Sequence, residues 1–272
     1  MVGENQPKKK LFEIIGNETA PQKLDPWWWL VALVVAIVVV LVVAFPDPYQ
    51  TMFTFFLDGV GVSVYVTALS FVLVMVVGLF GGLGRLSKNP IIHGVTTLYV
   101  EIVRGIPLLV QLMFWYFAFP SVVQSIGIAF EIRAFQKYLA DPIGMAVLGL
   151  VFCYAAYMSE IYRAGIQSIP KGQMEAARSL GMTSFQAMRY VIMPQAFRVI
   201  LPPVGNEFIA LLKDSSLVSV VAVADLTRRG REYMAAHFNP IQTWLLVGLL
   251  YLVLTLIASR IVTWIEKKSK ME

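Results

Sequence analysis

The chain has 272 residues, of which 58% are hydrophobic and only 14% are charged. A soluble domain of this size could not bury so much apolar surface, so composition excludes a soluble globular protein and predicts an all-α integral membrane protein in a lipid bilayer. The formal net charge of +5 comes from basic residues in separated loops, which argues against a nucleic-acid-binding surface.

The N-terminal segment has two parts. Residues 1–26 are polar and are predicted to form a cytoplasmic tail, whereas residues 27–45 form an unbroken apolar run. This run has about the 20 residues that a helix needs to cross the hydrocarbon core, and three tryptophans open it where an interfacial belt is expected. Because the run ends in Phe45-Pro46 and not in small residues before a cleavage site, it predicts a retained first span and not a signal peptide.

The second predicted span, 59–80, ends in a cluster of glycines. Gly78 and Gly82 have the four-residue spacing that lets two membrane helices approach closely. We therefore expect a helix contact at these two positions and not a ligand site.

The third predicted span, 91–119, is interrupted by Gly105 and Pro107 and is expected to close at Pro120. A proline in mid-membrane frees a backbone carbonyl, and such a break survives only where protein or a polar cavity satisfies it. The break is therefore a candidate part of a pathway.

The remaining apolar segments predict a fourth span at 143–161, a fifth at 204–226 that begins after Pro202-Pro203, and a sixth at 243–264, before a cytoplasmic tail at 267–272. With both termini in the cytoplasm, 14 of the 22 lysines and arginines lie in cytoplasmic segments, five lie in external loops and three lie inside spans, of which Arg260 is near the cytoplasmic end of the sixth. The positive-inside rule favours this multi-pass orientation.

Three arginines go against that rule: Arg228, Arg229 and Arg231 follow the fifth predicted span. Two interpretations are open. The cluster could meet an acidic surface on an extracytoplasmic partner, or it could belong to a solvated loop.

The stretch 172–194 is the one long polar run that apolar, span-length sequence encloses on both sides. Its first half has good helix formers up to Gly181, which can take a left-handed cap conformation. Thr183 and Gln186 then have the capping-box pattern of a second helix, which Pro194 is expected to end. A pair of short helices on one side of a membrane is typical of a docking element. An amphipathic connector in the lipid interface fits the same pattern equally well.

This stretch carries a family resemblance. Glu175-Ala176-Ala177, Gly181 and the segment Val191 to Pro194 resemble the cytoplasmic EAA loop of ABC importer permeases. Val191 and Met193 stand where those proteins usually have Ile and Leu. The resemblance implies a coupling helix that sits in a groove of a separate ATP-binding subunit. The residues that it places at this contact are Glu175, Ala176, Ala177, Arg178 and Gly181.

Three further segments resemble the polar amino-acid branch of that family: Tyr99 to Gln111, Leu212 to Leu217 and Ala224 to Gly230. Its members more often have Thr in place of Ile106, and in place of Ser215 or its neighbour.

The likeness covers residues 59–266 and implies a five-helix type I permease core there, so that the helix at 27–45 is an addition and the total is six transmembrane helices. It also implies a bacterial inner-membrane location, a polar amino acid as cargo and three protein partners. These partners are an ATP-binding subunit, a second permease subunit that is either a copy or a paralogue, and an extracytoplasmic solute-binding protein. No cofactor is expected on this chain, because ATP and Mg would bind the ATPase subunit.

Charged residues inside the predicted spans are candidates for a substrate pocket, because such groups are costly in a membrane unless they are paired or face water. The residues singled out as pocket candidates are Glu101, Arg104, Glu207, Lys213 and Asp214. A free amino acid needs a cation for its carboxylate, an acceptor for its ammonium group, and hydroxyls or amides for selection.

Arg104 or Lys213 would supply the cation in such a pocket, and Asp214 or Glu207 would supply the acceptor. Hydroxyl and amide groups are offered by Ser215, Ser216 and Gln111. A purely structural role is the alternative: Glu101 would pair with Arg104, and Lys213 with a nearby carboxylate, only to hold helices in register.

Several chemistries are not expected. The sequence has no GxxxxGK[ST] phosphate loop, so this chain should not hydrolyse ATP by itself. It also lacks a nucleophile and base at reactive spacing, so it is not expected to be an enzyme. His93 and His237 are isolated, so no metal site is expected. Cys153 is the single cysteine.

An ion-coupled secondary carrier or channel is the alternative function, with Glu101 and Asp214 as coupling carboxylates. Such carriers often contain internal repeats, and the two halves of this sequence show no convincing similarity.

Overall fold

The computed structural model describes residues 27–271, and every regular element within that range is helical. The predicted tail 1–26 lies outside the described residues. In chain order the elements are α2 (Trp27–Ala44), α3 (Pro46–Arg85), α4 (Pro90–Gly105), α5 (Leu108–Met113), the π-helical turn η1 (Phe114–Ala118), α6 (Phe119–Ala129), α7 (Arg133–Gln136), α8 (Pro142–Gln167), α9 (Lys171–Ser179), α10 (Ser184–Ala187), the π-helical turn η2 (Met188–Ile192), α11 (Met193–Asp214), the 3-10 helix η3 (Ser215–Val221), α12 (Leu226–His237) and α13 (Pro240–Met271).

Within residues 27–271, five helical segments are long and apolar enough to cross a membrane. They are Trp27–Ala44, Pro46–Arg85, Leu108–Ala129, Pro142–Gln167 and Pro240–Ser269. The predicted fifth span, 204–226, is not among them, because it corresponds to the charged end of α11 followed by η3. The all-helical membrane fold is therefore confirmed, whereas the count of six spans is not.

The predicted third span differs from the observed helices at both ends. The break at Gly105 to Pro107 is real, but it divides the segment into two helices, and only the part from Leu108 onward is a candidate span. This part continues past Pro120 to Ala129, so the expectation that Pro120 closes the span is wrong.

Both prolines that are expected to end helices instead follow a π-helical turn. Pro120 comes after η1 and Pro194 comes after η2, and the helix continues through each. A proline removes one backbone N–H and clashes with the preceding turn, and the wider π turn accommodates that clash. At Pro194 the side chain of Gln195 also donates a hydrogen bond to the Val191 carbonyl oxygen at 2.8 Å. Pro202 and Pro203 likewise lie inside α11, which begins well before them.

The packing of α3 on α8 forms the centre of the fold, and glycines make it close. A Cβ added at Gly78 would lie 2.6 Å from the Cβ of Met158, and one at Gly82 would lie 3.0 Å from the carbonyl oxygen of Ser159. No side chain larger than hydrogen fits these two positions without a shift. The predicted helix contact at Gly78 and Gly82 is confirmed.

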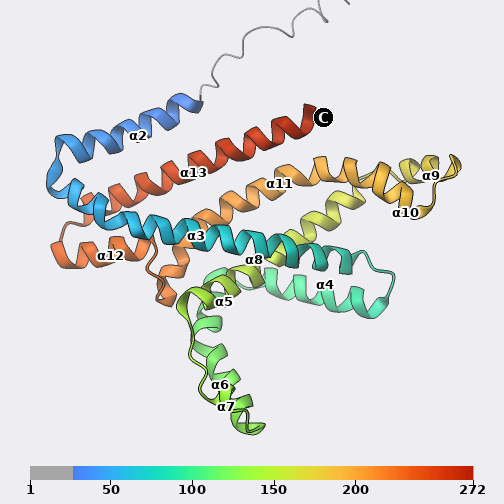
Figure 1. Cartoon of the computed structure of the whole chain (residues 1–272), viewed down its shortest axis with the longest axis horizontal. Coiled ribbons are helices and arrows are strands. Elements are labelled where there is room, and N and C mark those ends of the chain that lie inside the picture. Colours follow the sequence, from blue (N-terminus) through green and yellow to red (C-terminus); the bar gives the residue numbers. More distant parts are fainter. Residues whose placement is uncertain (1–26, 272) are drawn as a thin grey trace, which may run out of the picture.

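The added first helix, α2, packs along α13 and the first half of α3 (Figure 1). A second apolar core joins these helices to α12, with Val38, Phe56 and Leu246 among its buried members. The ring of Tyr233 on α12 lies 5.8 Å from that of Phe56. The first helix, α2, is thus packed into the helix bundle that supports α12.

An ion-pair cluster joins the ends of α3 and α8. Glu160 accepts hydrogen bonds from both Arg85 and Arg163, and Glu101 on α4 lies 3.8 Å from Arg85. The Arg85 side chain is only 11% exposed, so its charge needs these partners. The cluster fixes three helices next to the start of the polar loop 172–194.

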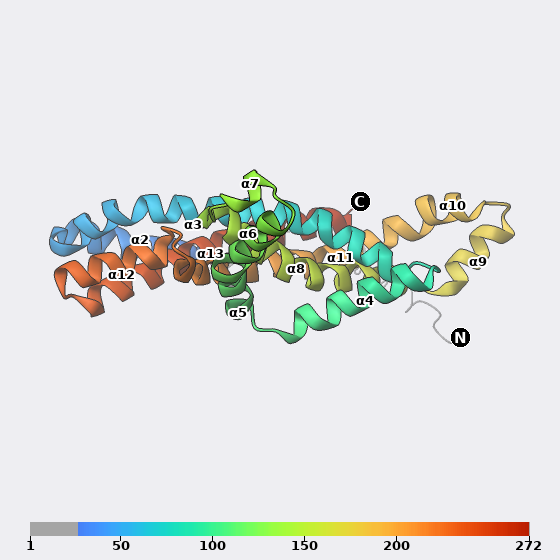
Figure 2. The same cartoon turned by 90° about the horizontal axis from the view of Figure 1, so that it is seen from below.

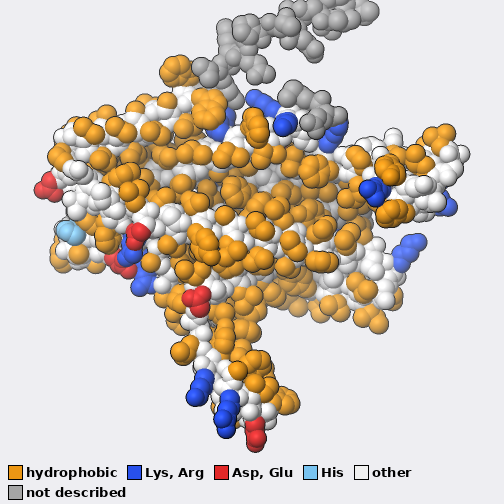
Figure 3. Space-filling model, viewed as in Figure 1, with side chains coloured by type: hydrophobic (Ala, Val, Ile, Leu, Met, Phe, Trp, Pro, Cys, Tyr) orange, Lys and Arg blue, Asp and Glu red, His pale blue; other side chains and the backbone are white. Residues whose placement is uncertain are grey.

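The molecule has two distinct ends. The α9–α10 pair and the α3–α4 turn lie toward one end, and α12 with the α2–α3 joint lies at the other (Figures 1 and 2). Apolar side chains cover the face between these ends (Figure 3). An arm made of α6 and α7 projects sideways from the bundle (Figure 1). The helix α13 continues through residues 267–271, so the predicted C-terminal tail is the end of this helix.

Candidate functional site

Two features of the structure bear on function: the polar helix pair α9–α10 and a cavity beside the break between α4 and α5. The helix pair turns at Gly181, whose φ of +84° lies in the left-handed region. The Gly181 N–H donates to the Arg178 carbonyl oxygen at 3.0 Å, and the Met182 N–H donates to that of Ala177 at 3.2 Å. These bonds satisfy the end of α9, as expected of a glycine cap.

The second helix of the pair starts with a complete capping box. The Thr183 N–H donates to Gln186 Oε1 at 2.8 Å, and the Gln186 N–H donates to Thr183 Oγ1 at 3.3 Å. The predicted turn and cap are confirmed. They make the pair a stiff unit at the end of the bundle (Figure 1).

The outer surface of the pair is partly apolar. Glu175, Ala176 and Arg178 are exposed, whereas Ala177 is buried. Two large apolar side chains at the tip are strongly exposed: Leu180 at 82% and Phe185 at 72%. Both residues flank the predicted turn, and the sequence pattern marks Leu180 as part of the apolar side of the first helix but does not mark Phe185.

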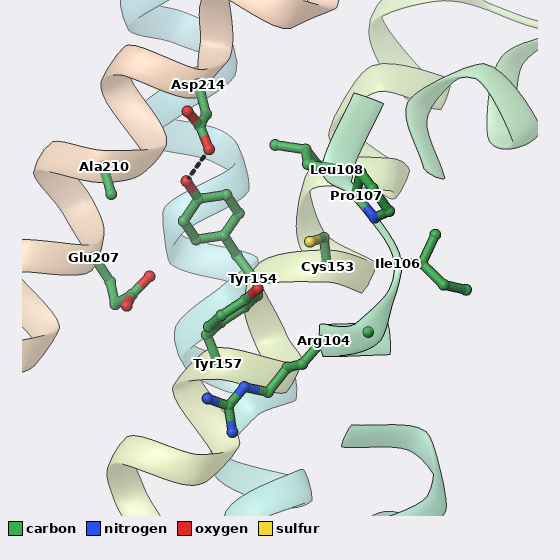
Figure 4. Close-up of a pocket in the computed structure, with 11 residues that line it drawn as sticks. Arg104, Ile106, Pro107, Leu108, Cys153, Tyr154, Tyr157, Glu207, Ala210 and Asp214 are labelled. Carbon is green, nitrogen blue, oxygen red and sulfur yellow. Dashed lines mark hydrogen bonds between the residues drawn. The ribbon is translucent and has the colours of Figure 1, made fainter. Parts of the chain in front are cut away.

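The cavity has a volume of about 470 Å³ and lies between α8, α11 and the α4–α5 break (Figure 4). The backbone from Gly105 to Leu108 forms one wall, and Cys153, Tyr154 and Tyr157 of α8 form another. Of the described residues that line it, three are charged: Arg104, Glu207 and Asp214. The structure therefore brings together three of the five charged residues that the sequence predicts for a substrate pocket.

The structure shows the orientation of each of the three charged side chains and, for Asp214 and Arg104, a contact with a tyrosine. Tyr154 donates a hydrogen bond from its hydroxyl to Asp214 Oδ2 at 2.7 Å. The Arg104 guanidinium lies 5.1 Å from the ring centre of Tyr157, within range of a cation–π contact. Glu207 lies two turns before Asp214 on α11, and both carboxylates project toward α8 (Figure 4).

The break itself is held by Gln111. Its Nε2 donates to the carbonyl oxygens of Val103 and Ile106, both at 2.9 Å. The Gln111 side chain thus supplies hydrogen bonds to the backbone carbonyl groups at the break before Pro107, as a break inside a membrane requires. Gln111 is buried behind the cavity wall and does not line the cavity.

The other predicted pocket residues lie elsewhere. Ser215 is buried and bonds the Leu212 carbonyl oxygen, and Ser216 does not line the cavity. Lys213 is exposed, and no ion pair within residues 27–271 joins it to a carboxylate. Glu101 is 68% exposed and lies near Arg85. The register pairs proposed for Lys213, and for Glu101 with Arg104, are therefore not what the structure shows.

Two tyrosines were missed by sequence reasoning. Tyr154 and Tyr157 stand three residues apart on one face of α8, within a span that reads as uniformly apolar. Their spacing and hydroxyl groups were the available signal.

The three arginines of α12 are engaged within the chain. Arg228 and Arg229 both bond Glu232, Arg229 also bonds Asp58 of α3, and Arg231 donates to the Ser219 carbonyl oxygen. The Arg228 hydrogen bond, with that of Arg229, lowers the pKa of the Glu232 carboxyl below its ordinary value. The cluster thus fastens α12 to α3.

Comparison with known proteins gives a consistent result. A family model described as "Binding-protein-dependent transport system inner membrane component" matches residues 74–271. The glutamine transport system permease protein GlnP of Escherichia coli (strain K12) is 36% identical over 215 residues, which cover 79% of this chain and 93% of GlnP. The arginine transport system permease protein ArgU of Corynebacterium glutamicum is 42% identical over 194 residues, which cover 71% of this chain and 61% of ArgU.

Solved structures agree in fold. A chain from the crystal structure of an amino acid ABC transporter with histidines superposes with a TM-score of 0.70 at 36% identity, over 80% of this chain and 96% of that one. A chain of the inward-facing MetNI methionine ABC transporter superposes with a TM-score of 0.65 at 20% identity, over 81% of this chain and 98% of that one, which shows a shared fold alone. The resemblance stated from the sequence is confirmed, and these relatives are transport components and not enzymes. The chain belongs to the family of binding-protein-dependent transport system inner membrane components, the permeases of ABC importers.

Proposed function

We propose that this chain is the permease subunit of an ATP-driven importer and forms the pathway for a polar amino acid across the bacterial inner membrane. The observation that carries the proposal is the cavity at the broken helix, which Arg104, Glu207 and Asp214 line together. These are the charges of both signs that a zwitterion requires. Glutamine, arginine and histidine in the names of similar proteins point to the same class of cargo.

In this proposal Arg104 binds the α-carboxylate of the cargo, and Glu207 or Asp214 binds its ammonium group. Tyr154 orients Asp214 through its hydroxyl. The residues that do not line the cavity are assigned no direct contact with cargo in this conformation: Glu101, Gln111, Lys213, Ser215 and Ser216.

The helix pair would couple the cavity to an ATPase subunit, which carries the ATP and Mg. Its exposed tip, with Leu180 and Phe185 beside Glu175 and Arg178, offers an apolar knob with a charged rim. Two permease subunits and two ATPase subunits would assemble, and closure of the ATPase pair would turn the cavity from inward-facing to outward-facing. A solute-binding protein would deliver cargo at the opposite end, near α12.

The same arrangement supports the proposed orientation. The α3–α4 turn, the helix pair and the C-terminal end of α13 lie toward one end of the molecule (Figure 1). These segments are rich in basic residues, so this end is assigned to the cytoplasm, with both termini there. The residues are Arg85, Lys88, Lys171, Arg178, Lys267, Lys268 and Lys270.

A crosslinking experiment tests the docking assignment. Cys153 is the single cysteine and is buried, so a Leu180→Cys variant places one reactive thiol at the tip of the helix pair. A photoactivatable maleimide at this position is expected to crosslink mainly to the ATPase subunit. The matched control is Leu139→Cys, equally exposed but in the segment between α7 and α8, which is expected to give no such product. Crosslinks from position 180 to lipid alone would favour the interfacial-connector interpretation instead.

A further inference from the structure

The net charge of the cavity indicates which class of amino acid it binds. Of the described residues that line it, Glu207 and Asp214 are acidic and Arg104 is basic, so the ionised cavity has a net charge of −1. A membrane site excludes most of the counterions that would otherwise compensate this charge. The cargo itself is the natural source of the missing positive charge.

Neighbouring groups do not provide it. The cluster next to the cavity contains two guanidinium groups, on Arg85 and Arg163, and two carboxylates, on Glu160 and Glu101. These four charges balance one another. Lys213 is adjacent to Asp214 in sequence, but it is exposed and does not line the cavity.

The positions of the two carboxylates on α11 also favour a cargo with two cationic groups. Glu207 and Asp214 are seven residues apart on α11, so their Cα atoms are separated by roughly 10 Å along the helix axis. Two carboxylates that are anchored two turns apart can each accept a charge-assisted hydrogen bond from a different cation. A single α-ammonium group compensates only one of these two negative charges, whereas a molecule with a second cation at the end of a flexible side chain compensates both.

We propose that the cargo is a cationic amino acid with a long basic side chain, of the arginine, lysine or ornithine type. This inference rests on the proposed function and makes it more specific. One carboxylate of α11 binds the α-ammonium group, the other binds the side-chain cation, and Arg104 binds the α-carboxylate. A neutral amino acid leaves one carboxylate uncompensated inside the membrane, and an acidic one leaves the cavity still more negative.

Arginine and citrulline provide the sharpest test, because they have nearly the same size and differ in side-chain charge. Binding of both, and of lysine and glutamine, is measured by calorimetry on the complex purified with this chain in nanodiscs. We expect arginine to bind at least tenfold more tightly than citrulline, the size of effect expected when a desolvated charge pair is formed.

The outcomes separate this inference from the proposed function. If an ATPase copurifies but citrulline or glutamine binds as tightly as arginine, the inference is wrong and the importer function stands. If no ATPase copurifies, or if no amino acid binds, the proposed function or its cavity fails and the inference fails with it.

Two variants test whether the carboxylates make the distinction. Glu207→Gln and Asp214→Asn each keep the side-chain size and remove one negative charge, so the preference for arginine over citrulline is expected to fall roughly tenfold in the variant that loses the partner of the side-chain cation. Glu131→Gln makes the same change at an exposed position between α6 and α7 and is expected to leave the preference unchanged. An unaltered preference in both Glu207→Gln and Asp214→Asn, with the complex intact by size-exclusion chromatography, would overturn the assignment.

Discussion

Replacing Asp214 by asparagine is expected to lower the initial rate of amino-acid uptake by about 30-fold or more, since removal of one partner from a buried charge pair has an effect of that order. Asparagine keeps the side-chain size and an oxygen that accepts the hydrogen bond from the Tyr154 hydroxyl, now 2.7 Å long. Only the negative charge at the cavity wall is removed. Uptake into proteoliposomes that contain the assembled complex measures the effect.

A lower uptake rate reports on the cavity only if the complex still assembles. Size-exclusion chromatography of the Asp214→Asn complex checks its assembly. Glu131→Gln, outside the cavity, serves as the neutral control and should transport normally. Unchanged uptake of several amino acids by Asp214→Asn would remove Asp214 from the pathway.

A leucine at position 181 is expected to uncouple transport from ATP hydrolysis. Gly181 has a φ of +84°, and a left-handed backbone costs an L-residue about 1–2 kcal/mol. No atom lies within 4 Å of an added Cβ, so the strain acts on the turn and not on packing. A penalty of this size reduces the population of the native turn about tenfold, and uptake per ATP hydrolysed should fall by a similar factor.

Two matched variants distinguish a backbone effect from a side-chain effect. Gly172→Leu adds the same side chain to the same helix pair, again into open space, at a position without positive φ, so coupling should be retained. Gly181→Asn should restore much of the coupling, because asparagine tolerates the left-handed conformation. Normal coupling in Gly181→Leu would mean that the turn between α9 and α10 does not transmit force.

Local sequence patterns predicted the features that depend on short-range chemistry. The spacing of Gly78 and Gly82 was sufficient to predict close helix packing, since that packing depends on the size of the residue alone. The Thr183 and Gln186 capping box formed as predicted, because both partners lie within one turn.

Features that depend on tertiary context were not predictable. Pro120 and Pro194 were expected to stop helices, yet the π turns before them let each helix continue, and no residue pattern in those turns marks them in advance. Similarly, the spacing of Glu101 and Arg104 favours a pair, but Arg85 comes from another helix and lies near Glu101 instead.

The candidate site was predictable in part for the same reason. Charges stand out in an apolar span, so Arg104, Glu207 and Asp214 were found, but their meeting at one cavity depends on how α4, α8 and α11 cross. Tyr154 and Tyr157 blend into an apolar span, and only their position in the fold marks them as cavity residues.

The most direct test of the central claim is ATP hydrolysis by the complex that copurifies with this chain in detergent or nanodiscs. The activity is titrated with a panel of amino acids in the presence of candidate binding proteins. The account predicts a copurifying ATPase that one group of amino acids stimulates. Transport by the chain alone under an ion gradient, with no ATPase present, would contradict the account and establish the secondary-carrier alternative.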